Sequence, residues 1–154
     1  MRRDRLIMIN HKGITLVELI VVMVIIAIGA VLLVPNIGAW LPSYRLRSAA
    51  RDVVSTLRTA QIRAVSTKMN YHVSFDPGAG SYILQHNSGG IWFDEGPSQT
   101  LPSGILISGI TFPANKAQFD PNFVSSGGNL TLQNPRGTQR LITISSATGR
   151  VHVN

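Results

Sequence analysis

The hydrophobic pattern of the chain begins with one long apolar run. From Ile14 to Val34 only Thr15 and Glu18 are plainly polar. As a helix this run would be about 31 Å long, close to the hydrocarbon thickness of a bilayer. It is longer than the apolar core of a usual secretory signal peptide. The pattern therefore predicts a membrane-spanning helix over residues 14–34.

A second helical pattern follows, over residues 35–69. Its apolar positions recur at spacings of four and three: Leu46, Ala50, Val53, Leu57, Ala60 and Ala64. This period predicts an amphipathic continuation of the helix. Pro35, Gly38 and Pro42 interrupt the helix-forming sequence, so a kink or partly unwound stretch is expected near residues 33–43.

Basic residues of this second segment fall on a face of their own. Arg47, Arg51 and Arg58 lie away from the apolar stripe. We expect them to be solvated or paired with neighbouring molecules, with contact to anionic lipid or to a negatively charged neighbour as the alternative.

Residues 70–154 change to short alternating runs separated by Gly, Pro, Asn and Ser. Six strands are predicted there: Tyr71–Phe75, Tyr82–Gln85, Ile105–Phe112, Leu130–Gln133, Leu141–Ser145 and Arg150–Val153. Asp76-Pro77-Gly78 and Thr148-Gly149 are among the turn signals. The predicted fold class is α+β, with a long N-terminal hydrophobic helix packed against an antiparallel β-sheet or sandwich head.

Composition and charge narrow the possible functions. The chain has 154 residues, 14% of them charged, a formal net charge of +7 and no cysteine. The missing cysteines exclude disulfides, thiolate metal sites and a cysteine nucleophile. Residues 69–154 carry four basic and four acidic residues, so the positive charge belongs to the first half. The net charge is therefore not a sign of a nucleic-acid-binding head.

Glu18 is the informative residue of the apolar run. A carboxylate within such a run costs a few kcal/mol at the helix centre and less near an end. It either reaches the membrane interface or pairs with a positive group inside an assembly. Its neighbours from Lys12 to Leu19 read Lys-Gly-Ile-Thr-Leu-Val-Glu-Leu. This stretch resembles the class III signal of type IV pilins and type II secretion pseudopilins.

The resemblance implies a processing and assembly site. A prepilin peptidase would remove residues 1–13 as a leader by cutting between Gly13 and Ile14, and would then methylate the amine of Ile14. Glu18 would become the fifth residue of the mature chain, where the family places a glutamate thought to pair with that amine on a neighbouring subunit. Pro35 would stand where pilins commonly carry a helix-bending proline.

The C-terminal part carries a second resemblance. The segment from Arg51 to Ala64 precedes a strand, and the chain ends with Leu141-Ile142-Thr143-Ile144-Ser145 and Thr148-Gly149-Arg150-Val151. These stretches resemble the H-type minor pseudopilins, the GspH/FimT group. The resemblance implies a pilin-like fold, an inner-membrane subunit with its head in the periplasm, and other pilins or pseudopilins of a filament as partners. The basic leader likewise places the N-terminus in the cytoplasm.

The chain shows little sign of catalytic or cofactor chemistry. His11, His72, His86 and His152 have no metal-ligand spacing, and Asp94-Glu95 and Asp120 form no calcium loop. Neither a nucleophile elbow nor a phosphate loop is present. The sequence therefore predicts a protein without cofactor, metal or enzymatic activity.

The sequence is compatible with three functions. The first is a minor pseudopilin, a structural subunit of the pseudopilus in type II secretion, embedded in inner-membrane lipid before assembly. The second is a FimT-type minor type IV pilin acting in pilus assembly or DNA uptake, for which Arg136, Arg140 and Arg150 are the candidate DNA contacts. A membrane-anchored enzyme with a β domain is the third, and no motif favours it.

Overall fold

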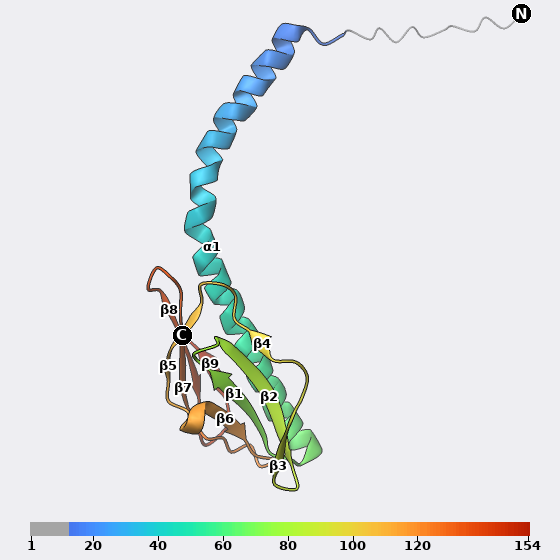
Figure 1. Ribbon diagram of the computed structural model, residues 1–154, viewed down its shortest axis with the longest axis vertical. Coiled ribbons are helices and arrows are strands. Elements are labelled where there is room, and N and C mark those ends of the chain that lie inside the picture. The colour runs from blue at the N-terminus through green and yellow to red at the C-terminus, as the bar shows by residue number, and fades with distance from the viewer. Residues whose placement is uncertain (1–12) are drawn as a thin grey trace, which may run out of the picture. The chain divides into compact units, whose positions relative to one another are not determined.

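A computed structural model describes residues 13–154, apart from the side chains of residues 32–37 and of Ala39. One long helix, α1 (Leu16–Thr67), precedes a region of strands (Figure 1). The chain divides into two units, of which the first ends at Gly38 and the second spans residues 39–154. The predicted leader lies outside the described residues except for Gly13.

The helix is continuous through the region where an interruption was expected. Residues 33–43 are all helical, so no unwound stretch separates the two helical segments, and the bend at Pro35 stays a prediction. Within the described part of the chain, no helix combines the length and the apolar character needed to cross a membrane. The predicted span over residues 14–34 includes residues 32–34, whose side chains lie outside that description.

The strands form two antiparallel sheets. Sheet A has the order β3-β2-β1-β6, with β4 paired to β2, and sheet B has the order β5-β7-β8-β9. The strands of sheet A are β1 (Tyr71–Asp76), β2 (Ser81–Ser88), β3 (Ile91–Asp94), β4 (Gln99–Thr100) and β6 (Lys116–Phe119). Those of sheet B are β5 (Leu106–Ile110), β7 (Gly128–Gln133), β8 (Gln139–Ile144) and β9 (Val151–Val153). A short 3₁₀ helix, η1 (Pro113–Asn115), lies between β5 and β6.

Local polar contacts set the ends of these elements. The Asp76 carboxylate accepts hydrogen bonds from the backbone N–H groups of Gly78 and Ala79, at 2.9 and 3.0 Å, and so closes the β1–β2 turn. Lys68 has a φ of 57° directly after α1, a left-handed conformation that ends the helix before β1. The left-handed backbone at Lys68 is therefore where the chain leaves the helix.

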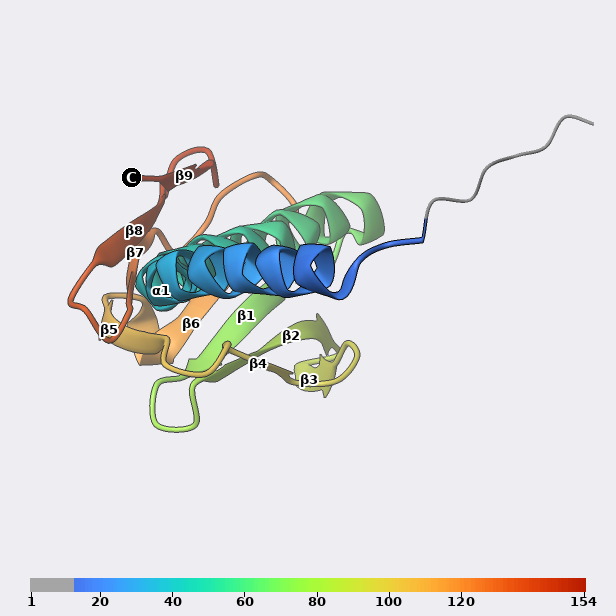
Figure 2. The same ribbon diagram turned by 90° about the horizontal axis from the view of Figure 1, so that it is seen from above.

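The core of the second unit is built on the predicted apolar stripe of α1. All six predicted positions are buried, and Ala49 and Val54 join them. Alanines along the stripe allow the sheets to approach the helix closely. Tyr71, Val73 and Phe119 from sheet A, and the buried leucines and isoleucines of β7 and β8, cover it from the other side. Figure 2 shows strands of both sheets gathered around one side of this part of α1.

A polar contact joins α1 to sheet B at the chain's far end. The side-chain amide of Gln61 donates a hydrogen bond to the carbonyl of Thr148, at 3.2 Å. Gly149 follows with a φ of 63°, and a Cβ there would lie 2.8 Å from Gln61 Nε2 and 3.2 Å from the Phe123 carbonyl oxygen. The Thr148-Gly149 turn therefore needs glycine both for its conformation and for the approach of Gln61.

This contact predicts that Gly149→Ala is more damaging than an alanine at another left-handed glycine. Gly80 has a φ of 61° with open space around a Cβ, so Gly80→Ala should cost only the conformational term of about 1 kcal/mol. Gly149→Ala should lower the free energy of unfolding by about 1–2 kcal/mol more, because it displaces Gln61. Urea unfolding of the full chain in a nonionic detergent measures both, and equal losses would contradict the steric argument.

Candidate assembly site and interaction surfaces

The first turn of α1 brings Thr15 and Glu18 together. Thr15 precedes the helix, and its hydroxyl accepts a hydrogen bond from the backbone N–H of Glu18, at 3.2 Å. The carbonyl of Thr15 accepts from the N–H of Leu19, also at 3.2 Å. Thr15 is thus the N-cap and Glu18 the third helical residue, the positions of a capping box. Sequence reasoning missed this cap, although the Thr-x-x-Glu spacing is its signal.

The carboxylate of Glu18 is left available by this arrangement. Glu18 is exposed, and within the described residues its side chain has no hydrogen bond or ion pair. A negative charge in the first turn of a helix is favourable, because the backbone N–H groups there carry partial positive charge. Within the described residues, the carboxylate of Glu18 is therefore available to pair with a positive group of another molecule.

Gly13 and Ile14 lie just before the cap. A Cβ built on Gly13 would meet no atom within 4 Å, and Ile14 is 76% exposed. Among residues 13–154, nothing therefore imposes a steric need for glycine at position 13. A requirement for glycine there must come from another molecule that handles this segment.

The first half of α1 presents an apolar surface all round. Every residue from 14 to 31 is exposed except Gly29, which is half-buried. Such a helix needs lipid or other protein to cover it, because apolar surface in contact with water is unfavourable. Pro35 lies farther along the same helix, among the residues whose side chains are not described.

Two arginines of α1 tie the helix to the head. Arg45 donates from Nη1 to the carbonyl and to the hydroxyl of Ser103, at 3.2 and 3.0 Å. Arg63 forms an ion pair with Glu95, with 2.6 Å between Nη1 and Oε1. The hydrogen bond that Arg63 donates to Glu95, and next the negative charge of Glu95, raise the pKa of Arg63. Both side chains are partly exposed, so the pair contributes modestly to stability.

The other arginines of the second unit lie in several places. Arg140 lines the same groove as Arg47, Arg51 and Arg58 of α1. Arg136 belongs to the turn before β8, whereas the carbonyl of Arg150 pairs with the N–H of Ser145, just past the other end of that strand. The three candidate DNA contacts Arg136, Arg140 and Arg150 are therefore spread along β8 rather than gathered.

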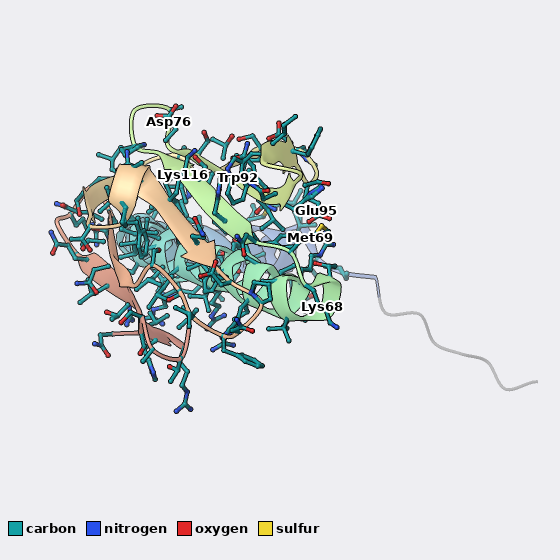
Figure 3. All side chains as sticks on the ribbon, turned by 90° about the horizontal axis from the view of Figure 1, so that it is seen from below. Lys68, Met69, Asp76, Trp92, Glu95 and Lys116 are labelled. Atoms are coloured by element: carbon teal, nitrogen blue, oxygen red, sulfur yellow. The ribbon has the colours of Figure 1, made fainter. Side chains whose placement is uncertain are left out.

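The outer face of sheet A carries a row of polar residues across three strands. His72 on β1 lies opposite Gln85 on β2, which lies opposite Asp94 on β3. His72 Nε2 is 2.6 Å from Gln85 Oε1, and Gln85 Nε2 donates to Asp94 Oδ1, also at 2.6 Å. The ring of Trp92 lies over His72, with 3.8 Å between ring centroids. Figure 3 shows Trp92 and Lys116 on this face.

Burial sets the charge state of His72. The residue is 1% exposed, and this burial lowers the pKa of His72. The hydrogen bond with Gln85 acts in the opposite direction, and the charge of Lys116 adds to the lowering. Neutral His72 is therefore favoured in the folded head, where it acts as a packed polar residue rather than a cation.

Metal ligands do not gather in the described part of the chain. No group of three or more histidine, aspartate or glutamate residues there is placed to hold a metal ion. His86 faces Tyr71 across the β1–β2 pair, and His152 is exposed on β9. His11 lies outside the described residues.

The chain was compared with protein-family models, curated sequences and solved structures. Residues 8–34 match the family model described as the prokaryotic N-terminal methylation motif. No curated protein sequence matches the chain significantly. Among solved structures the chain is similar to the minor pseudopilin EpsH from the type 2 secretion system of Vibrio cholerae. One EpsH structure has a TM-score of 0.62 at 12% identity, covering 71% of this chain and 96% of that one.

Two further structures give the same picture. A second structure of EpsH has a TM-score of 0.60 at 12% identity, covering 73% of this chain and 94% of that chain. The type IV minor pilin FimU of Pseudomonas aeruginosa has a TM-score of 0.56 at 16% identity, with 71% and 92% covered. The chain therefore carries a prokaryotic N-terminal methylation motif and has the α+β pilin-like fold, which confirms the fold class predicted from the sequence.

The buried His72 predicts that the head loses stability in acid. The unfolded chain protonates this histidine near its ordinary pKa of about 6.5, whereas the folded chain resists protonation. The contribution to stability is therefore complete above about pH 6.5 and declines as the pH falls below it, by about 1.4 kcal/mol for each unit of pKa lowering.

Urea unfolding of the full chain at about pH 7.5 and about pH 5.5 measures this effect. His72→Gln keeps a donor for Gln85 without titrating, so its stability should differ less between the two pH values. The exposed His152 provides the matched control, and His152→Gln should behave like the unaltered chain. An unchanged pH dependence in His72→Gln would show that other groups cause the acid sensitivity.

Proposed function

We propose that this chain is a minor pseudopilin, a structural subunit of the periplasmic pseudopilus of type II protein secretion. The observation that carries the proposal is the presence of a methylation motif and a pilin-like β head in one chain. The likeness of the head to EpsH supports the assignment to a pseudopilus. The exposed apolar half of α1 supports an assembly role, because neighbouring helices or lipid must cover it.

Processing is the first step of the proposed pathway. A prepilin peptidase cuts between Gly13 and Ile14 and methylates the new amine of Ile14. The chain is then held in the inner membrane by α1, with the N-terminus in the cytoplasm and the head in the periplasm. The cut lies before the N-cap, so the hydrogen bond between Thr15 and Glu18 survives it.

Assembly follows from the charge that processing creates. The amine of Ile14 places a cation beside a helix N-terminus, where the partial charge of the backbone is also positive. The unused carboxylate of Glu18 on a neighbouring subunit neutralises it in a low-dielectric environment. Such a pair favours one axial register between subunits, and Pro35 is the position at which the helix bends to pack.

A FimT-type minor type IV pilin is the second candidate, supported by the likeness to FimU. The two roles are separated by deleting the gene in the cell that makes the protein. Loss of secreted enzymes with intact pili supports the pseudopilin, whereas loss of pilus assembly or of DNA uptake supports the pilin. Binding of DNA through Arg136, Arg140 and Arg150 belongs to this second candidate.

Mass spectrometry of the membrane-bound chain tests processing. With a co-expressed prepilin peptidase, the mature chain should begin at Ile14 and carry one methyl group. Gly13→Val should abolish the cut, because a branched side chain obstructs the close approach of the peptidase to the backbone. The variant should keep the fold of the head, since a Cβ at position 13 meets no atom of the described residues. An intact N-terminus in the unaltered chain, with active peptidase present, would overturn the proposal.

A substitution at Glu18 separates assembly from processing. The Thr15 cap uses only the backbone N–H of residue 18, so Glu18→Gln retains the cap and a side chain of similar size while the charge is lost. Cleavage should remain normal and incorporation into filaments should fall about tenfold, equivalent to about 1.4 kcal/mol. Asp52→Asn removes one charge from the exposed part of the second helical segment and is the matched control. Normal incorporation of Glu18→Gln would rule out the proposed pairing.

A further inference from the structure

A groove within residues 39–154 runs between α1 and the last two strands of sheet B. Its volume is about 640 Å³, within the range of sites that bind small ligands or short segments. Four arginines line it: Arg47, Arg51 and Arg58 from α1, and Arg140 from β8. Its lining contains no acidic residue, so the groove concentrates positive charge.

These four arginines are not used by the fold. Within the described residues none of them has an ion pair or a side-chain hydrogen bond. By contrast, Arg45 and Arg63 of the same helix are held by Ser103 and Glu95 of the head. Arg47 and Arg51 are four residues apart, and like charges at this spacing destabilise a helix by a few tenths of a kcal/mol. The repulsion between these arginines lowers the stability of the isolated chain, and a bound anion would relieve it.

The uncharged part of the lining limits the chemistry of that occupant. Ala50 and Val54 are buried beneath the arginines, and Ile62 and Val153 are 67% and 43% exposed at the groove. None of the lining residues is aromatic, so the groove lacks the stacking surfaces on which proteins hold single-stranded bases. Carboxylates together with aliphatic side chains match this lining better than nucleotides do.

We propose that this groove binds an acidic, aliphatic segment of a neighbouring protein subunit. Its carboxylates pair with the four arginines, and its aliphatic side chains cover Ile62 and Val153. From Arg47 to Arg58 the helix rises about 16 Å, the length of about five residues of extended chain. The identity of the partner as a filament neighbour rests on the proposed function, whereas the binding chemistry of the groove does not.

Binding by the purified full chain in a nonionic detergent tests the chemistry. The probes are a labelled peptide of alternating glutamate and leucine, the same peptide with lysine for glutamate, an oligodeoxynucleotide of equal charge, and a short-chain phosphatidylglycerol. The glutamate peptide should bind, and Arg51→Glu with Arg58→Glu should weaken it at least about tenfold. Arg136→Glu with Arg150→Glu makes the same charge change outside the groove and should leave binding within about twofold. Tighter binding of the oligonucleotide or the lipid, or equal effects of the two double variants, would overturn the proposal.

Photocrosslinking in cells that secrete through this system identifies the partner. Ile62→p-benzoylphenylalanine places the probe in the groove, and Ile91→p-benzoylphenylalanine places it at an equally exposed position on β3. Ile62 should crosslink to an acidic segment of another subunit, and the crosslink should disappear with Arg51→Glu and Arg58→Glu. The proposed occupant would be overturned by a crosslink that persists after the charge reversal at Arg51 and Arg58. It would also be overturned if the probe at position 62 gave no crosslink in a chain that is cut before Ile14. Failure of the cut itself would instead count against the proposed function.

Discussion

The fold of the head depends on one constraint: both β-sheets must pack against the same helix. Leu57, Ala60 and Ala64 are fully buried because strands of both sheets converge on the same side of α1. Small residues along this stripe let the strands approach, and the arginines are displaced to its flanks. The positions of the ion pair at Glu95, the contact at Thr148 and the basic groove all follow from where those flanks lie.

The arginines of α1 show how one helix combines internal and external contacts. Arg45 donates hydrogen bonds to Ser103 and Arg63 pairs with Glu95. These contacts with the head fix the rotation of the helix about its axis. With that rotation fixed, Arg47, Arg51 and Arg58 must face the other flank beside β8 and β9. Fold and candidate binding surface are therefore set by the same few contacts. A change at Glu95 would reach the groove only through the orientation of α1.

Much of this architecture was predictable, for a physical reason. The spacing of Leu46, Val53 and Leu57 encodes the buried stripe, because a helical period depends on residues close in the sequence. Strands β3, β4 and β6 were not predicted, since each is only two to four residues long and is held by its neighbours rather than by its own pattern. The same holds for the groove, because only the folded sheets bring Arg140 beside the arginines of α1. The cap at Thr15 was missed, although the spacing of Thr15 and Glu18 is a signal for it.

The hydrogen bond from Gln61 to Thr148 joins residues 87 positions apart. A ribosome completes α1 and β1 well before it reaches β7 and β8, which cover the rest of the stripe, and β9 comes last. During synthesis the chain therefore carries two uncovered apolar surfaces, of which only one is hidden by its own folding. Long-range pairings of this kind form slowly, and exposed apolar surface favours aggregation in the meantime. Rapid insertion of the first half of α1 into a membrane would cover one of these two surfaces before the head has begun to fold.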